Sequence, residues 1–154
     1  MMNIETIVVP TDFSDNAAVA MPYALDLSRA FGSQIHLVHV FEASLYFTAT
    51  AADTFAVLSA TPAKWLETKV LENEELLIMA GKKFAADGIN VTTKLLRGNP
   101  VKELVKYASE QRNACFVLAT HGHTGLAHAL MGSVAERIVR TSMCPVLTVR
   151  PESK

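Results

Sequence analysis

The sequence predicts an α/β fold, a single doubly wound parallel sheet of five strands with helices on both faces. Two observations lead to this prediction: five short runs rich in β-branched and apolar residues recur along the chain, and segments with helical spacing separate them. Such alternation is typical of parallel sheets, whose right-handed crossovers place helices on both faces. The apolar runs are nearly continuous, as expected for strands that are covered on both sides.

The five runs define the expected strands. They are Ile4–Pro10, Ile35–Phe41, Ile89–Leu96, Ala114–Thr120 and Pro145–Arg150. The first strand ends at its proline, which has no N–H to continue the hydrogen-bond ladder. The third strand contains Thr92, Thr93 and Lys94 and is more polar than the others. We therefore expect the third strand at an edge of the sheet.

The first expected helix follows the first strand. Ser14 or Asp15 can cap its start, and Gly32 ends it after Phe31. Pro22 lies inside this helix, and because proline removes a backbone donor we expect a kink there.

Three further helices are expected between the later strands. The second runs from about residue 62 to residue 87, with Gly88 as its C-cap. The third opens at Asn99 with Pro100 in the favoured first position, and the fourth opens at Gly132–Ser133 and ends near Ser142. Residues 43–60 show no clear period, and we expect them to form a loop.

Composition and net charge indicate what kind of protein this chain is. The chain has 154 residues, of which half are hydrophobic and 19% charged, so we expect one globular domain with a real core. Fourteen Lys and Arg against fifteen Asp and Glu leave a net charge of -1, so neither nucleic acid nor a membrane is an expected partner. Residues 1–5 lack signal-peptide features, and two cysteines are too few for a secreted disulfide scaffold. We expect a cytoplasmic protein.

A glycine-rich segment after the fourth strand is the main candidate for a binding site. Gly122 and Gly125 allow backbone to approach a ligand closely, and Gly132–Ser133 begins a helix. The unpaired amides and positive dipole of a helix start bind phosphate without a basic side chain. Thr11 and Asp12 follow the first strand and would face the same crevice. Asp12 could also simply cap the first helix.

The chain resembles universal stress proteins of the ATP-binding, UspA-like type. The resemblance rests on Ile7–Ser14, Ile35–Val40, the glycine segment, Gly132–Arg137 and Cys144–Arg150. The nucleotide pattern of that family is glycine, two residues, glycine, nine residues, then glycine with Ser or Thr. Gly122, Gly132 and Ser133 fit this pattern, whereas its first position is occupied by Ala119.

The resemblance implies one universal stress protein (Usp) domain over residues 1–154, with a Rossmann-like, adenine nucleotide alpha hydrolase-like fold. It implies ATP as ligand, with Mg²⁺ or Mn²⁺ bound through the phosphates, and a homodimer formed through the C-terminal strand, Val146–Arg150. The Val40 backbone would meet adenine, and Gly122 and residues 132–134 would cradle the phosphates. The implied nucleotide-binding residues are Pro10, Thr11, Asp12, Val40, Ala119, Gly122, Gly132, Ser133 and Val134.

The expected function is therefore an ATP-binding regulatory protein of the stress response, with unidentified protein partners. We expect no catalytic residue and at most slow hydrolysis, because no Lys or Arg occurs from Ala119 to Ala135 and no phosphate-binding loop with a lysine is present. Two alternatives stay open. One is a dimeric interaction module of the same family that has lost ATP binding, which Ala119 favours. The other is an enzyme, a slow ATPase or a nucleotidyl-transferring relative.

The histidines and cysteines suggest no further chemistry. His121, His123 and His128 lack the spacing of a four-ligand metal site, so we expect no metal held by side chains. His36 and His39 lie three apart on one strand, hence on opposite faces, and are expected to be packing or surface residues. Cys115 is expected to be a small buried hydrophobe, and Cys144 to be partly exposed.

Overall fold

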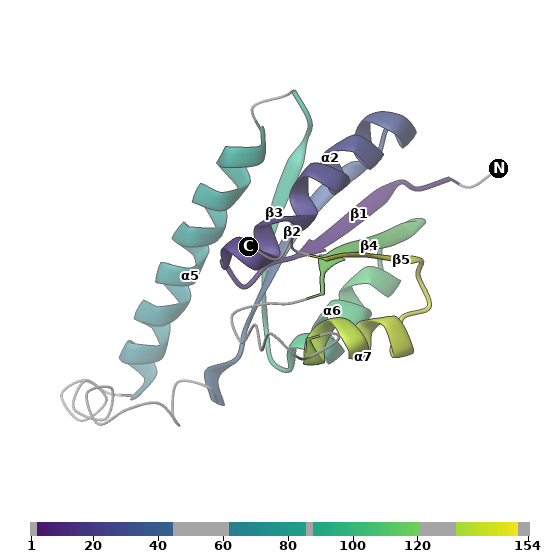
Figure 1. Cartoon of the computed structure of the whole chain (residues 1–154). Helices are drawn as coiled ribbons and strands as arrows, with labels where there is room; N and C mark the ends of the chain where they lie inside the picture. The colour runs from purple at the N-terminus through teal and green to yellow at the C-terminus, as the bar shows by residue number, and fades with distance from the viewer. Residues whose placement is uncertain (1–2, 45–61, 86–87, 121–131, 151–154) are drawn as a thin grey trace.

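The computed structural model describes residues 3–44, 62–85, 88–120 and 132–150, which contain one five-stranded sheet (Figure 1). The strand order is β3-β2-β1-β4-β5, and every neighbouring pair is parallel. The predicted fold class is therefore confirmed. The strands are β1 (Thr6–Pro10), β2 (Gln34–Phe41), β3 (Val91–Arg97), β4 (Ala114–Ala119) and β5 (Val146–Val149).

Helices cover both faces of the sheet. They are α1 (Asp15–Ala18), α2 (Ala20–Phe31), α5 (Pro62–Phe84), α6 (Pro100–Ser109) and α7 (Ser133–Thr141). Figure 1 shows α2 and α5 on one side of the sheet and α6 and α7 on the other. Each side has its own core because successive strand residues point to opposite faces. Thus Ile7 and Val9 of β1 belong to the core under α2, and Val8 between them belongs to the core under α6.

The first predicted helix is divided into two. The structure has a break at Val19, between α1 and α2, where the sequence predicts a kinked continuous helix. Pro22 explains the break, since it cannot donate to the carbonyl of Ala18 and its ring crowds that carbonyl. The predicted end of the helix is confirmed: Gly32 is left-handed at φ 69°, and its N–H bonds to the Ser28 carbonyl.

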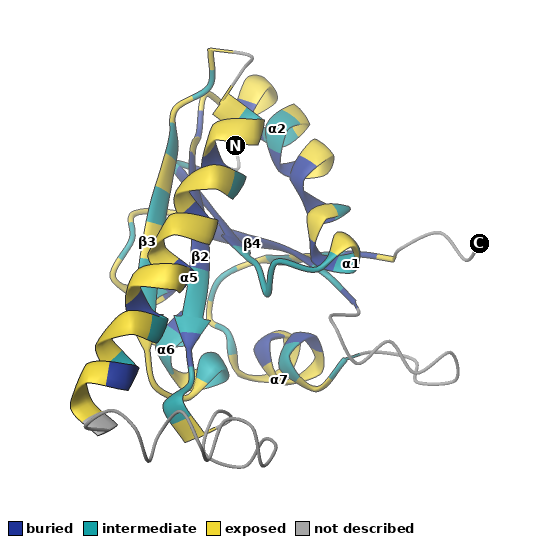
Figure 2. Ribbon diagram, turned by 90° about the vertical axis from the view of Figure 1, so that its left-hand side faces the viewer, coloured by how far each residue is buried: buried dark blue, intermediate teal, exposed yellow. Residues whose placement is uncertain are grey.

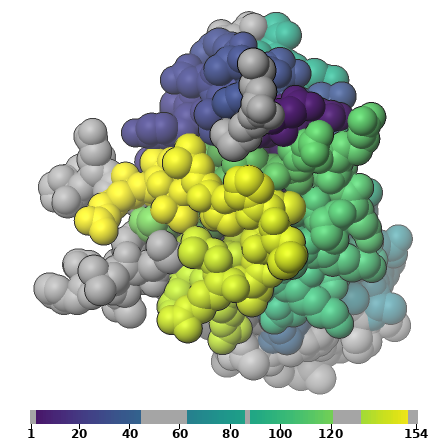
Figure 3. All heavy atoms as spheres, turned by 90° about the vertical axis from the view of Figure 1, so that its right-hand side faces the viewer, coloured from purple at the N-terminus to yellow at the C-terminus, as the bar shows by residue number. Residues whose placement is uncertain are grey.

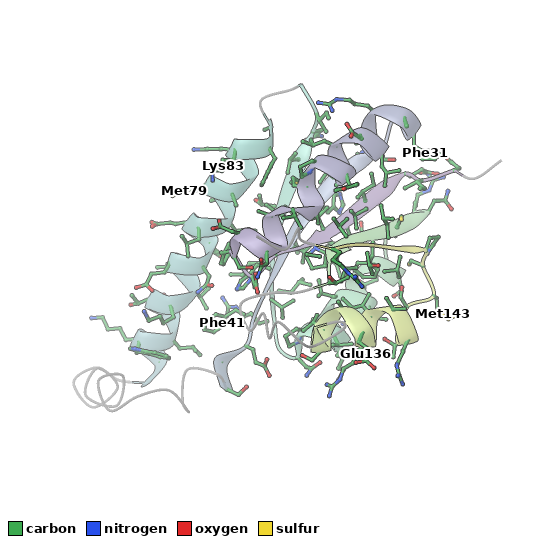
Figure 4. The ribbon with its side chains drawn as sticks, in the orientation of Figure 1. Phe31, Phe41, Met79, Lys83, Glu136 and Met143 are labelled. Atoms are coloured by element: carbon green, nitrogen blue, oxygen red, sulfur yellow. The ribbon has the colours of Figure 1, made fainter. Side chains whose placement is uncertain are left out.

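The edge position predicted for β3 is confirmed. It is the terminal strand in the order β3-β2-β1-β4-β5, its residues are at most half-buried, and α5 and α6 pack against it. On its inner side α5 approaches β3 closely at Gly81, where an added Cβ would lie 2.5 Å from Cγ2 of Thr93. The outer side of α5 is exposed along its length (Figure 2). It carries Met79 and Lys83, which Figure 4 labels on this side.

Two smaller predictions can also be compared with the structure. Cys115 is 4% exposed and Cys144 is half-buried, as predicted, and neither forms a disulfide. Within the four described ranges, no helix combines the length and the apolar character needed to cross a membrane. The loop predicted for residues 43–60 falls almost entirely outside the described residues.

Candidate functional site

The carboxyl ends of β1 and β4 form the part of the sheet where the strand order reverses. Pro10 ends β1 and Ala119 ends β4, and the two strands are parallel neighbours, so these residues lie at the same edge. Thr11 and Asp12 follow Pro10, and Val40 lies near the end of β2 on the other side of β1. Ligands of doubly wound sheets bind outside this edge, at the reversal point. The topology thus places five of the predicted residues, Pro10, Thr11, Asp12, Val40 and Ala119, at the carboxyl ends of neighbouring strands.

The turn after β1 is organised by its own polar side chains. Oδ1 of Asp12 accepts hydrogen bonds from the backbone N–H of Ser14 at 3.0 Å and from its hydroxyl at 2.5 Å. The Ser14 hydroxyl oxygen in turn accepts from the N–H of Ala17 and caps α1. The helix cap is therefore Ser14, not Asp15 or Asp12. Asp12 instead orients the cap from a half-buried position at the sheet edge.

The same turn is joined to β2 through Thr11. The Thr11 N–H donates to the Val38 carbonyl at 2.9 Å, and the Thr11 carbonyl oxygen lies 2.7 Å from Nδ1 of His39. The His39 ring also packs against the ring of Phe13, with centroids 4.3 Å apart. Sequence reasoning did not assign His39 to this site. No local signal could have done so, because its partner Thr11 lies 28 positions earlier.

The two histidines of β2 lie on opposite faces, as predicted. His36 faces α6, where its Nδ1 is 2.9 Å from the Tyr107 hydroxyl, and burial lowers the pKa of this histidine. Burial also lowers the pKa of His39, against the opposing effects of hydrogen bonds to Thr11 and Asn73 and of the Asp12 charge. Both rings therefore favour the neutral form more strongly than a histidine in water.

The start of α7 is attached to the end of β4. Gly132 is the N-cap of α7, and its N–H donates to the carbonyl of Thr120, the residue after β4. Thr120 in turn donates its N–H to Val149 of β5 at 2.8 Å. Ser133 is exposed and Val134 half-buried in the first turn of the helix. The predicted helix start is therefore confirmed, and it lies beside the end of a central strand.

This helix start has the chemistry of an anion site. Gly132 has no side chain with which to bond the amides of the first turn, and the helix dipole places positive charge there. The acidic residue of that turn, Glu136, is paired with Arg140 at 2.9 Å. Gly122, the remaining predicted phosphate-binding residue, lies outside the described residues.

A groove elsewhere on the surface is distinct from this edge. It lies between α6 and α7, has a volume of about 550 Å³, and is lined in part by Val101, Val105 and Arg137. None of the predicted site residues lines it. The candidate site therefore depends on the sheet edge and on the start of α7.

Known proteins resemble this chain over almost its whole length. Residues 3–150 match the model of the universal stress protein family. Universal stress protein MJ0531 of Methanocaldococcus jannaschii is 31% identical over 148 residues, which cover 96% of this chain and 83% of that protein.

Solved structures share the fold. The structure of MJ0577 of the same organism gives a TM-score of 0.80 at 24% identity, with both chains covered completely. A universal stress protein from Archaeoglobus fulgidus, solved in complex with dAMP, gives a TM-score of 0.63 at 20% identity. That match covers 96% of this chain and 98% of the other.

Proposed function

Because the chain belongs to the universal stress protein family, we propose that it binds ATP at the carboxyl edge of β1 and β4 and acts as a nucleotide-responsive regulatory protein of the stress response. The observation that carries the proposal is the start of α7. Its N-cap Gly132 is hydrogen-bonded to Thr120, so the positive end of the helix lies at the carboxyl end of β4, one of the two strands between which the strand order reverses. A related protein of the same fold was solved with the adenine nucleotide dAMP.

The phosphates would bind at the first turn of α7. Amide N–H groups of Ser133 and Val134 and the exposed Ser133 hydroxyl are donors, which suits an anion. A Mg²⁺ or Mn²⁺ ion, when bound, would neutralise phosphate charge. Within the described ranges no group of three or more His, Cys, Asp and Glu side chains could hold a metal ion. In this proposal the ion is held through the phosphate oxygens.

The adenosine would bind nearer to β1 and β2. The half-buried Asp12 carries a carboxylate, which can accept hydrogen bonds from ribose hydroxyls. Pro10 and Thr11 lie beside it, and the backbone of Val40 at the end of β2 would meet the adenine edge. Ala119 at the end of β4 would lie between the two parts of the nucleotide. The nucleotide thus spans the reversal point from β2 to α7.

We propose binding without efficient turnover. Phosphoryl transfer needs positive charge on the transferring group, and the segment from Ala119 to Ala135 contains no Lys or Arg. In the described part of this segment the donors are backbone amides and hydroxyls. Slow hydrolysis is the upper limit that we expect.

Calorimetric titration with ATP and Mg²⁺ tests the proposal. The parent protein should bind saturably. Ser133→Asp adds a negative charge at the phosphate position and should weaken binding about tenfold or more, which corresponds to about 1.4 kcal/mol. Ser109→Asp adds the same charge at the exposed end of α6, just before the amino end of β4 and thus at the opposite ends of the strands from the site. It should leave the affinity for ATP unchanged. Equal affinity in the parent and the folded Ser133→Asp variant would contradict the site.

The second candidate function is a dimeric interaction module that does not bind ATP, and Ala119 is the residue that favours it. Its methyl group stands where the family pattern has glycine, at the last residue of β4. If this methyl is the obstacle, the parent will not bind ATP and Ala119→Gly will. If neither protein binds, the nucleotide proposal is wrong and the interaction module is the better candidate.

We also propose a homodimer formed through β5. This strand is at the edge of the sheet, and Leu147 on it and Met143 before it are 38% and 95% exposed. Figure 3 shows the C-terminal part of the chain, in yellow, across the middle of one face, and Figure 4 labels Met143 at the outside. In sedimentation equilibrium Leu147→Glu should give monomers, whereas Tyr23→Glu, at an exposed position on α2, should remain dimeric. A dimeric Leu147→Glu protein would place the interface elsewhere.

A cytoplasmic location is part of the same proposal. Both cysteines of the chain, Cys115 and Cys144, are free thiols. Free cysteines are typical of proteins in reducing compartments. Cell fractionation with an antibody to the protein is the direct test.

A further inference from the structure

His39 connects three elements beside the candidate site. It belongs to β2, and its Nδ1 is 2.7 Å from the carbonyl oxygen of Thr11 in the turn after β1. A carbonyl oxygen only accepts hydrogen bonds, so Nδ1 carries the hydrogen and donates it. The third element is α5, whose buried Asn73 lies near enough to the histidine to act on its pKa.

The turn that His39 holds has an unfavourable backbone conformation. Phe13 has φ 66°, a left-handed value that is uncommon for residues other than glycine. The Phe13 N–H bonds to the Thr11 hydroxyl within the turn, and the Phe13 ring packs against the His39 ring. His39 therefore supports Phe13 through the ring contact and Thr11 through a hydrogen bond.

Two hydrogen bonds join Thr11 of the turn to β2. One is the backbone bond from Thr11 to Val38, which any sequence could make, and the other is the bond from the His39 side chain. Asn73 of α5 lies near the histidine and acts on its pKa. It is 6% exposed, and its own Nδ2 donates to the Lys69 carbonyl at 2.8 Å, which holds the amide in place.

We propose that His39 is a positioning residue of the nucleotide site, which holds residues 11–13 so that Asp12 keeps its place at the sheet edge. This inference rests on the proposed function, because Asp12 is assigned there to the adenosine. His39 itself need not touch the nucleotide. Its substitution should therefore reduce affinity through the conformation of the turn.

Three substitutions at His39 separate this role from simple packing. His39→Asn keeps an amide nitrogen at the position of Nδ1 and can still donate to Thr11. His39→Gln places its amide nitrogen nearer to the position of Nε2, and His39→Leu has no donor. His36→Leu is the matched control: His36 is buried on the same strand, bonds to Tyr107, and faces away from the turn.

Calorimetric titration of these variants with ATP and Mg²⁺ gives the first readout. His39→Leu should lower affinity about tenfold, the scale of a lost buried hydrogen bond, and His39→Asn should recover most of that loss. His36→Leu should leave affinity within about twofold even though it also removes a buried hydrogen bond. Equal losses for the two leucine variants, or none at His39, would overturn the proposal. If His39→Leu does not fold, a lack of difference between the Asn and Gln variants would overturn it.

Amide hydrogen exchange of the ligand-free protein gives a second readout that does not depend on nucleotide binding. In His39→Leu, or in His39→Gln if the former does not fold, the amides of Phe13 and Ser14 should exchange faster than in the parent. They should be unchanged in His36→Leu. If the parent binds no nucleotide but exchange follows this pattern, the proposed function fails while the positioning of the turn by His39 stands. Unchanged exchange in the His39 variant refutes the positioning.

Discussion

The contact between Gly81 and Thr93 allows a stability prediction whose size can be worked from the structure. An added Cβ at Gly81 would lie 2.5 Å from Cγ2 of Thr93, whereas ordinary van der Waals contact begins at 3.4 Å. Overpacking of this kind costs about 1–3 kcal/mol. Replacement of glycine by alanine inside a helix gains about 0.8–1.0 kcal/mol. Gly81→Ala should therefore lower the free energy of unfolding by about 1 kcal/mol, the midpoint of the cost less the gain.

The Thr93→Ser background isolates the cause. Serine lacks Cγ2, so the clash disappears and Gly81→Ala should then raise the free energy of unfolding by about 1 kcal/mol. The two substitutions should thus be coupled by about 2 kcal/mol. Urea unfolding can be followed by the fluorescence of Trp65, the single tryptophan, which is buried. Equal effects of Gly81→Ala in the two backgrounds would refute the reasoning.

Three further predictions concern stability. Asn99→Ala should lower the free energy of unfolding by about 1 kcal/mol, because Oδ1 of Asn99 accepts a hydrogen bond from the Lys102 N–H at 3.1 Å and caps α6. Asn99→Asp can still cap the helix and should keep most of the parent's stability in urea unfolding. Phe116→Ala should cost about 3–5 kcal/mol in the same assay, because Phe116 is fully buried in the core under α6. Burial lowers the pKa of His36 and His39 below the ordinary value of 6.5, so the unfolded chain binds protons more readily than the folded one. The contribution of these histidines to the free energy of unfolding should therefore be fully present above about pH 6.5 and be lost as the pH falls from there towards the folded-state pKa values. The urea midpoint should depend less on pH in His36→Asn than in the parent across this range.

The order and kind of the elements could be predicted from the sequence because their signals are local. Apolar runs identified the strands, and the polar residues of 92–94 identified the edge strand. Asn99 with Pro100 predicted the start of α6, and Gly32 predicted the end of α2, since caps act within a few residues of the helix end. For the same reason the sequence showed that Asp12 follows the first strand and that Ala119 lies at the end of the fourth. Doubly wound sheets bind ligands at these strand ends.

Other features were decided only by the tertiary structure. His39 meets Thr11 across 28 positions, and His36 meets Tyr107 across 71. The spacing of the two histidines predicted that they lie on opposite faces of the sheet, but not which residue each one would contact. The sequence by itself determined the elements and the strand ends that carry the candidate site. Only the pairing of distant segments determined which side chain holds the turn after β1, because the contact of His39 with Thr11 exists only once β1 and β2 lie side by side.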